Sequence, residues 1–316
     1  MRRPTTLAIL LLVALVTALA AGCGGDDDGG TGGGDGLSGT IQADGSSTVG
    51  PFTTRAAENF QAENGDVNVT VGISGTGGGF ERFCRGETDL SNASRPIKDE
   101  EAAICEENGV AYTELQVVQD ALTVVVNTAN DWATCLTVEE LNAIWKPGSK
   151  VDSWSEVRDG FPDVPLKLYG AGTDSGTFDY FTDVVNGEEG ASRSDYSASE
   201  DDNVTVQGVS GDEGALGYFG FSYYEENQDT LKALEIDGGN GCVAPSVETA
   251  QDGSYAPLSR PLFIYVKNEA LERPEVEAFL TYTLENAQTI AEEAQFVPLN
   301  DEQVADQQAK LEEALA

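Results

Sequence analysis

Three short segments of this sequence combine glycine with hydroxyl side chains and stand directly before amphipathic stretches. They are Gly45–Val49 (GSSTV), Ser74–Phe80 (SGTGGGF) and Thr173–Phe178 (TDSGTF). Where such a segment leads into a helix, the first turn offers backbone N–H groups without partners and carries a positive charge of about half an elementary unit. Glycine lets a ligand approach the backbone, and serine or threonine adds hydrogen-bond donors without adding charge. Together these features predict a site for a small anion.

The same segments do not match other motifs that use glycine or serine. Gly75 and Gly77 follow an apolar stretch, but Phe80 occupies the position of the third glycine in the dinucleotide fingerprint. No Gly-Lys-Ser or Gly-Lys-Thr occurs, so there is no P-loop. Ser175 lacks a histidine base because the chain contains no histidine, which excludes serine–histidine hydrolysis and the commonest zinc sites. Each segment alone also fits ordinary helix capping, and only their combination favours an anion site.

One cation lies close to these segments along the chain. Arg95 belongs to Asp89–Pro96 (DLSNASRP), where a short apolar stretch ends at a proline. Its planar guanidinium suits the geometry of a tetrahedral oxyanion. Because the chain holds 55 aspartate and glutamate residues, a pairing of Arg95 with a neighbouring carboxylate is the alternative. The sequence leaves both interpretations open.

Composition narrows the classes of protein that remain. The formal charge of −38 excludes a general nucleic-acid binder, because no basic face is available to neutralise phosphates along a strand. Hydrophobic residues make up 40% of the chain, which favours a packed core over disorder. We expect neither a metal nor a cofactor, since the aspartates of Gly24–Gly36 lack the ligand spacing and the closing glutamate of a calcium loop.

The N-terminus has the pattern of an export signal. Two arginines precede the apolar run Leu7–Ala21, which is too short for a mature membrane span but fits the core of a signal peptide. Small residues directly before Cys23 predict lipoprotein processing, with residues 1–22 removed and Cys23 acylated. An ordinary signal peptide followed by an unrelated cysteine is the alternative. Residues 23–36 are expected to form a flexible tether, so that the mature protein is extracytoplasmic and anchored to the membrane.

From Thr40 onward, short apolar stretches alternate with amphipathic ones, which predicts an α/β fold with largely parallel sheets. Strands are predicted at 41–43, 67–73, 90–93, 112–117, 121–127, 166–169 and 262–266. Helices are predicted at 49–62, from the second glycine segment to 83, at 99–108, from 137 to 145, from the third glycine segment to 185, at 274–294 and at 301–315. The first helix is expected to bury Phe52 and Phe60, and Thr137 with Glu140 predicts a capping box.

No linker interrupts the mature chain, so we expect the chain to pass between two lobes more than once. Stretches near 118–123 and 256–262 are the predicted crossings. Lobe I then comprises 37–120 plus 258–316, and lobe II comprises 121–257. This division predicts a hinge, and a ligand cleft between the lobes.

Four cysteines remain besides Cys23: Cys84, Cys105, Cys135 and Cys242. In an oxidising compartment, an even number of cysteines without metal-type spacing indicates two disulfides. Three pairings are possible. We favour Cys84–Cys105 and Cys135–Cys242, because each pair then stays inside one lobe.

Six segments carry a resemblance to a known family: the loop at 45–49, SGTGGGF at 74–80, DLSNASRPI at 89–97, GTDSGTFDYF at 172–181, GALGYFGF at 214–221 and RPLFIYVKN at 260–268. In order and spacing they resemble the extracytoplasmic phosphate-binding proteins of the Pst-type ABC transporter, over essentially all of 38–316. The resemblance implies a type II periplasmic-binding-protein fold, in which each lobe is a mostly parallel sheet flanked by helices. It also implies a binding protein rather than an enzyme, which delivers inorganic phosphate to the permease of an ABC importer. We expect a monomer that contacts the membrane only through its lipid anchor.

The resemblance also assigns phosphate-binding residues, segment by segment. Ser47 and Thr48 match the first phosphate loop, Thr76 and the amide of Gly77 the second, and Ser175, Gly176 and Thr177 the third. Ser94 and Arg95 stand where better-known members have an aspartate that accepts a phosphate proton, and Ala171 stands where they have an arginine. Our hypothesis is that Arg95 supplies the missing cation from the other lobe. The hydroxyl of Ser94 can donate or accept a hydrogen bond there.

Three alternatives stay open. Without the aspartate, another tetrahedral oxyanion (sulfate, molybdate or an organic phosphate) is the nearest alternative ligand. A secreted phosphohydrolase would use the same pocket with an activated water, although the chain lacks histidine and a clustered run of metal ligands. A purely structural surface protein would show no ligand-induced thermal shift.

Overall fold

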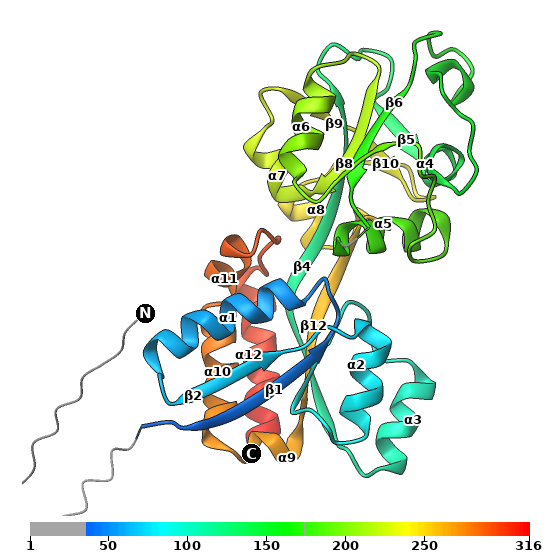
Figure 1. The fold of residues 1–316 in the computed structure, drawn as a ribbon. Helices are drawn as coiled ribbons and strands as arrows, with labels where there is room; N and C mark the ends of the chain where they lie inside the picture. Colours follow the sequence, from blue (N-terminus) through cyan, green and yellow to red (C-terminus); the bar gives the residue numbers. More distant parts are fainter. Residues whose placement is uncertain (1–35, 174) are drawn as a thin grey trace, which may run out of the picture. The chain divides into compact units, whose positions relative to one another are not determined.

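The computed structural model of this chain describes residues 36–173 and 175–316 (Figure 1). The predictions for the export signal, for Cys23 and for the tether as far as residue 35 lie outside the described residues, as does Asp174 of the third glycine segment. Gly36–Ala316 forms one unit by its internal contacts.

Helices and strands alternate along most of the described chain, as predicted. In chain order the first half holds β1 (Gly39–Gly45), α1 (Gly50–Glu63), β2 (Val67–Val71), α2 (Gly75–Cys84), β3 (Leu90–Ala93), α3 (Asp99–Glu107), β4 (Tyr112–Asn127), β5 (Cys135–Thr137), α4 (Val138–Trp145) and a 3₁₀ turn (Trp154–Glu156). The second half holds β6 (Lys167–Ala171), α5 (Gly176–Asn186), β7 (Ser197–Ser199), α6 (Asp202–Ser210), β8 (Ala215–Gly220), α7 (Phe221–Glu226), β9 (Leu231–Ala233), β10 (Glu235–Asp237), β11 (Cys242–Val243), α8 (Val247–Gln251), β12 (Ser259–Lys267), α9 (Asn268–Leu271), α10 (Pro274–Glu285), α11 (Ala287–Glu293) and α12 (Asp301–Leu315).

Most strands join one long sheet in the order β2-β1-β3-β12-β4-β8-β6-β7, with β9 also pairing with β4. Pairing is parallel among β1, β2 and β3 and among β6, β7 and β8. It is antiparallel where β12 meets β3 and β4, and where β4 meets β8. The predicted α/β fold is confirmed, and its parallel strands lie at the two ends of a sheet whose middle is antiparallel.

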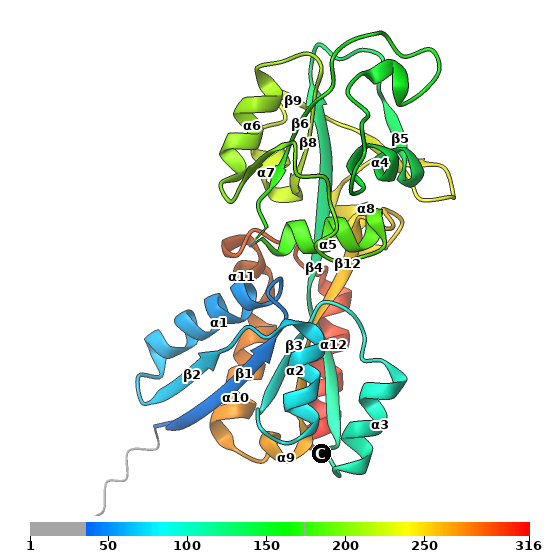
Figure 2. The ribbon, with the colours of Figure 1, turned by 45° about the vertical axis from the view of Figure 1, so that its right-hand side comes forward.

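The long strand β4 corrects one prediction, because 112–117 and 121–127 are parts of one strand of 16 residues. Its first part pairs with β12 as far as Ala121, and its last part pairs with β8 from Leu122 onward. Gln119 and Asp120 lie between the two predicted strands, where the crossing near 118–123 was expected. Both are buried, Gln119 donating to the carbonyl of Ala250 and Asp120 pairing with an arginine of β12. Figure 2 shows β4 and β12 running side by side through the fold.

The two hydrophobic cores with the most residues lie on either side of this junction. The first draws on residues within 41–118 and 262–311, including Phe52 and Phe60 of α1 as predicted. The second draws on residues within 122–258, where Phe181 and Tyr218 stack with ring centroids 3.8 Å apart. The lobe boundaries given above stay a prediction, while these cores mark which residues pack together.

Helix ends follow the local sequence closely. The predicted capping box before α4 is confirmed: the amide of Glu140 donates to the hydroxyl of Thr137 at 3.2 Å, and the amide of Thr137 donates to the carboxylate of Glu140 at 2.9 Å. The helix predicted at 274–294 is instead interrupted at Asn286, between α10 and α11. Among the described residues, no helix combines the length and the apolar character needed to span a membrane.

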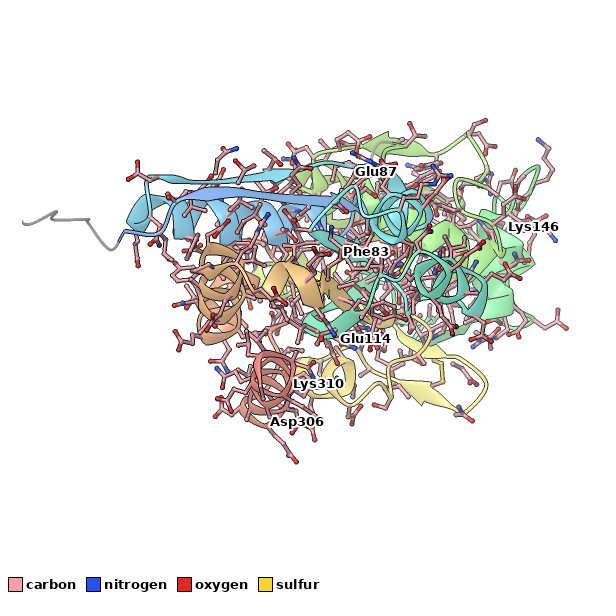
Figure 3. The ribbon with its side chains drawn as sticks, turned by 90° about the horizontal axis from the view of Figure 1, so that it is seen from below. Phe83, Glu87, Glu114, Lys146, Asp306 and Lys310 are labelled. Carbon is pink, nitrogen blue, oxygen red and sulfur yellow. A yellow bond between two sulfur atoms is a disulfide. The ribbon has the colours of Figure 1, made fainter. Side chains whose placement is uncertain are left out.

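The last helix, α12, closes the first core. Leu311 and Gln307 are buried beneath it, whereas Asp306 and Lys310 are exposed (Figure 3). The side-chain oxygen of Gln307 accepts a hydrogen bond from the amide of Gln116 in β4 at 3.0 Å. This contact satisfies a strand amide next to an irregularity in the β4–β12 pairing.

The predicted disulfides are confirmed. Cys84–Cys105 joins α2 to α3, and Cys135–Cys242 joins β5 to β11. Neither bridge links the first core to the second, as expected from a pairing within lobes.

Candidate functional site

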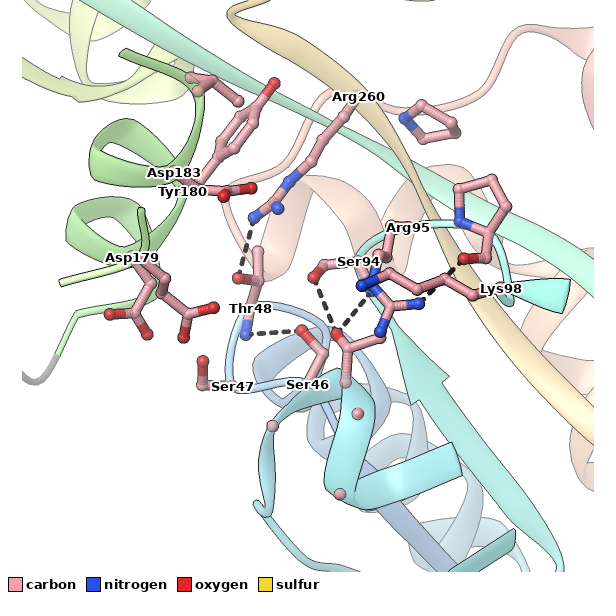
Figure 4. Close-up of a pocket in the computed structure, with 18 of the residues that line it drawn as sticks. Ser46, Ser47, Thr48, Ser94, Arg95, Lys98, Asp179, Tyr180, Asp183 and Arg260 are labelled. Atoms are coloured by element: carbon pink, nitrogen blue, oxygen red, sulfur yellow. Dashed lines mark hydrogen bonds between the residues drawn. The ribbon is translucent and has the colours of Figure 1, made fainter. Parts of the chain in front are cut away.

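A cavity of about 700 Å³ lies where the loops before α1 and α2 approach the side of α5 and the start of β12 (Figure 4). Its walls are formed by Ser46, Ser47, Thr48, Ser74, Gly75, Thr76, Gly77, Gly78, Ser94, Arg95, Pro96, Lys98, Asp179, Tyr180, Asp183, Val184, Glu189, Pro257, Ser259, Arg260 and Pro261. The set combines hydroxyl groups, backbone amides, three cations and three carboxylates. Six of the nine predicted binding residues are among them.

The first loop, Gly45–Val49, takes its shape from Gly45 and from hydrogen bonds to Ser46. Gly45 has a φ of +138°, and a Cβ there would lie 2.2 Å from the carbonyl oxygen of Asn92, so no other residue fits. The hydroxyl of Ser46 accepts from the amides of Thr48 and Val49 at 3.2 and 3.4 Å. Ser46 therefore orders the turn that leads into α1, and the neighbouring Ser47 and Thr48 border the cavity with it.

The second loop packs directly against the first. The amide of Ser74 donates to the carbonyl of Gly45 at 3.1 Å, and a Cβ on Gly79 would lie 2.5 Å from the Cα of Gly45. The hydroxyl of Thr76 lies 2.9 Å from that of Ser94 and accepts from the amide of Ser94 at 3.2 Å. The starts of α1 and α2 are thus neighbours at one wall of the cavity.

The third loop reaches the first from the opposite side. Ser175 caps α5 by accepting from the amide of Thr177 at 3.1 Å. Gly176 packs on Thr48 so closely that a Cβ would come within 2.9 Å of its hydroxyl oxygen. Ser175, Gly176 and Thr177 are not themselves among the described residues that border the cavity, which is instead lined by the side of α5. The three helix starts converge, with the first loop in contact with both others.

Arg95 pairs with a neighbouring carboxylate, the alternative that the sequence left open, and it also borders the cavity. Its two terminal nitrogens each donate to Glu101 at 2.8 Å. This hydrogen bonding raises the pKa of Arg95. Burial raises the pKa of Glu101, but the hydrogen bonds from Arg95 and from the amide of Lys98 outweigh it, and the net pKa is lowered. Both groups are therefore charged at neutral pH; the contact of Arg95 with a ligand stays a prediction.

Sequence reasoning missed a second guanidinium at the cavity. Arg260 is the second residue of β12, and its side chain is only 17% exposed. It lies 3.3 Å from a carboxylate oxygen of Asp120, donates to the hydroxyl of Thr48 at 3.1 Å, and stacks over the ring of Tyr180 at 3.6 Å. Burial raises the pKa of Asp120, against the lowering effect of Arg260. The available signal was a lone cation at the head of an apolar strand.

Three carboxylates were also missed, and they line the wall opposite the first loop. Asp179 and Asp183 project from α5 toward Ser47 and Thr48 (Figure 4). Burial raises the pKa of Asp179 and the charge of Glu189 adds to this, while Arg260 and a hydrogen bond with Ser47 lower it. A wall of this kind accepts a hydrogen bond from a protonated ligand and repels a fully ionised one.

The described residues contain one cluster with the proximity of metal ligands: Cys135, Glu235 and Cys242. Its two sulfur atoms form a disulfide. Metal coordination needs thiolates, so this cluster does not fit a metal.

The family model for the PBP superfamily domain matches residues 30–287. The protein SphX of Synechococcus elongatus is 51% identical over 262 residues, which cover 82% of this chain and 77% of the relative. A phosphate-binding protein PstS of Staphylococcus saprophyticus is 41% identical over 279 residues, covering 88% of this chain and 86% of the relative. The crystal structure of a possible phosphate binding protein from Planctomyces limnophilus aligns with a TM-score of 0.85 at 50% identity, covering 89% of this chain and all of that one. The range matched by the family model includes all three glycine segments, and the relatives cover most of the chain, so the chain belongs to the PBP superfamily and, within it, to the Pst-type phosphate-binding proteins.

Proposed function

We propose that this protein binds inorganic phosphate in the cavity beside the three helix starts and delivers it to an ABC importer. The observation that carries the proposal is the convergence of these starts. The first loop bonds to the second through Ser74 and Gly45, and it packs on the third through Thr48 and Gly176. Three helix starts in contact with one another favour a small, compact anion, because the first turn of a helix carries a partial positive charge.

The binding residues of the proposal are those that sequence reasoning assigned: Ser47, Thr48, Thr76, Gly77, Ser94, Arg95, Ser175, Gly176 and Thr177. An overall charge of −38 does not oppose this function. Exposed charges are largely screened beyond about 8 Å at physiological salt, whereas amides and hydroxyls act on the ligand at contact distance.

The cavity is wider than one oxyanion requires, since its volume of about 700 Å³ is in the range of pockets that hold much larger ligands. We therefore propose that binding narrows it. The two hydrophobic cores are joined through β4 and β12, and a bend of these strands would bring α5 toward the first loop.

Titration calorimetry of the soluble domain with phosphate, arsenate and sulfate tests the ligand. We expect phosphate and arsenate to bind and to raise the melting temperature, because a ligand that binds only the folded state stabilises it. Sulfate or molybdate binding in preference to phosphate would assign the site to another oxyanion. No heat and no thermal shift with any of them would leave a structural surface protein.

We further propose that the protein binds without catalysing a reaction. The support is the absence of histidine from the sequence and the disulfide that occupies the cysteine cluster. A colorimetric phosphatase assay with added divalent metals is expected to show no turnover. Turnover that disappears when Thr76 is replaced would favour the phosphohydrolase.

The lipid anchor is part of the same proposal and rests on the sequence around Cys23. We propose an extracytoplasmic monomer whose only attachment to the membrane is the acylated Cys23. The full chain is expected in the membrane fraction and labelled by a fatty acid. The Cys23→Ser variant is expected to be absent from the membrane fraction and unlabelled. A membrane-bound, unlabelled Cys23→Ser protein would contradict the anchor.

A further inference from the structure

Arg260 contacts three separate parts of the fold at the cavity wall. Its guanidinium donates to Thr48 of the first loop, stacks over Tyr180 of α5 and pairs with Asp120 of β4. Val49, which follows Thr48, belongs to the first hydrophobic core, and Tyr180 belongs to the second. One side chain therefore bridges the two halves of the molecule.

The two arginines of the cavity differ in how many donors they retain. Arg95 gives both terminal nitrogens to Glu101 and one of them also to the carbonyl of Pro96. Arg260 uses Nε for Asp120 and Nη2 for Thr48, and its Nη1 has no hydrogen-bond partner among the described residues. Its side chain is also less exposed, at 17% against 32% for Arg95. A less hydrated guanidinium with an unused nitrogen interacts more strongly with an anion.

The position of Arg260 in the sheet coincides with the passage between the cores. Arg260 lies directly opposite Asp120 in the β4–β12 register, and one residue further Ser259 lies opposite Ala121. From Leu122 onward β4 pairs with β8 instead. The guanidinium is therefore fixed at the place where a bend of the two strands changes the distance between Thr48 and Tyr180.

We propose that Arg260 is a further ligand-binding residue, and that it couples phosphate binding to the approach of the two halves. The inference rests on the proposed function and deepens it. An oxyanion bound at Nη1 fixes the guanidinium, which then holds the hydroxyl of Thr48 on one side and the ring of Tyr180 on the other. Asp120 orients the guanidinium and balances its charge in the buried strand pair.

Calorimetry on three variants tests the binding step. Arg260→Met removes the donors and the charge, and we expect phosphate affinity to fall by roughly 100-fold, as for the loss of two charge-assisted hydrogen bonds. Arg260→Lys keeps the charge without the planar fork and is expected to lose roughly tenfold. Arg158→Met is the matched control, because Arg158 also combines a carboxylate partner, Glu140, with an aromatic ring, Phe161, but borders no part of the cavity. It is expected to retain wild-type affinity.

The coupling step needs a second measurement, the radius of gyration by small-angle X-ray scattering with and without saturating phosphate. We expect phosphate to compact the wild type and Arg158→Met, and Arg260→Lys to bind without full compaction. Wild-type affinity in a folded Arg260→Lys protein would overturn the binding role. Weaker binding with full compaction would overturn the coupling. A wild type that binds no phosphate would overturn the proposed function itself, and with it this inference.

Discussion

Hydroxyl groups around the cavity are divided between holding the loops and facing the ligand. Ser46 accepts from an amide of the turn that leads into α1, and Ser175 accepts from an amide in the first turn of α5, so their loss acts first on the approach to these helices. Thr76 instead joins two segments, because it accepts from the amide of Ser94 while its side chain borders the cavity. Removing a hydroxyl therefore has different consequences at each position.

The hydroxyl of Thr76 gives a direct prediction. Thr76→Val leaves the amide of Ser94 without its acceptor and removes a donor from the cavity, so we expect phosphate binding to weaken by about 1–3 kcal/mol. Thr70→Val is the control, because Thr70 of β2 donates to the carbonyl of Ile41 in β1 and does not border the cavity. Calorimetry showing equal affinity in the two variants would remove Thr76 from the site.

The carboxylate of Asp179 predicts selectivity between ligands. It borders the cavity and hydrogen-bonds Ser47, so it can accept the proton of hydrogen phosphate and repel sulfate, which carries none. Asp179→Asn is expected to raise sulfate affinity relative to phosphate by roughly ten- to a hundredfold, the effect of removing a nearby like charge. Asp301→Asn, also in the first turn of a helix but outside the cavity, is expected to leave the ratio unchanged. Competition calorimetry with both anions measures it; an unchanged ratio in Asp179→Asn contradicts the role.

Individual site residues could be predicted from the sequence where their role depends on neighbouring residues in the chain. Glycine and hydroxyl residues before a helix by themselves indicate a cap or an anion-binding loop. For this reason Ser47, Thr48 and Thr76 were predicted. Arg260 was not, because its contacts depend on the β4–β12 register and on α5, which lie far from it in sequence. The pairing of Arg95 with Glu101 was predictable only as an alternative, since many acids compete for one arginine.

Among the helices and strands, the packing of α2 depends on one close contact between Gly79 and the first loop. A Cβ on Gly79 would meet the Cα of Gly45 at 2.5 Å and the carbonyl oxygen of Asp44 at 3.1 Å, whereas a Cβ on the adjacent Gly78 would meet only the side chain of Ser74. Backbone atoms cannot move aside as a side chain can. The two glycines of one helix therefore have opposite roles.

Gly79→Ala is expected to lower the free energy of unfolding by about 1–3 kcal/mol through overpacking. Gly78→Ala is expected to leave it unchanged or to raise it by about 0.4–1 kcal/mol, because alanine lowers the entropy of the unfolded chain. Urea denaturation of both variants makes the comparison. Equal losses in the two would mean that the contact between α2 and the first loop does not limit the packing.

Long elements were predictable from their periodicity, and short ones were not. The apolar face of α1 and the capping box of α4 are both encoded in a few residues. By contrast, β5, β10 and β11 are two or three residues long and exist because they pair with one another. The division of β4 was predicted wrongly because the burial of Asp120 depends on a partner that the local sequence does not contain.

For the whole molecule, the two disulfides constrain chain segments of very different length. Cys84–Cys105 spans 21 residues and Cys135–Cys242 spans 107. Loop-closure entropy grows with the segment, from about 3 kcal/mol for a loop of about 15 residues to about 4.7 kcal/mol for about 100. The longer bridge encloses most of the segment that supplies the second core.

We therefore expect Cys135→Ser/Cys242→Ser to lose more stability than Cys84→Ser/Cys105→Ser, with losses of about 4.7 and about 3 kcal/mol. Urea denaturation under non-reducing conditions measures the free energy of unfolding of both double variants. The wild type in reductant gives the loss of stability when both disulfides are absent. A larger loss for the shorter bridge would show that local packing of α2 on α3 outweighs chain entropy.

The α/β fold itself was predictable, because strand–helix alternation is a property of the whole pattern and tolerates local errors. The order of the strands in the sheet was not predictable. It depends on which strands pair with the first core after the chain has passed through the second core. In particular, nothing local to Leu90–Ala93 indicates that its neighbour in the sheet is Ser259–Lys267.

That placement of β12 between β3 and β4 dictates an order of assembly. A nascent chain that has emerged as far as residue 258 already holds all the residues of the second core, which can close at once. The first core, although it begins earlier, still lacks the strand that separates β3 from β4 and the helices that follow. The edges of its N-terminal strands therefore stay unpaired until almost the last residue has been synthesised. Unpaired strand edges are the part of a folding chain that associates most readily with other chains.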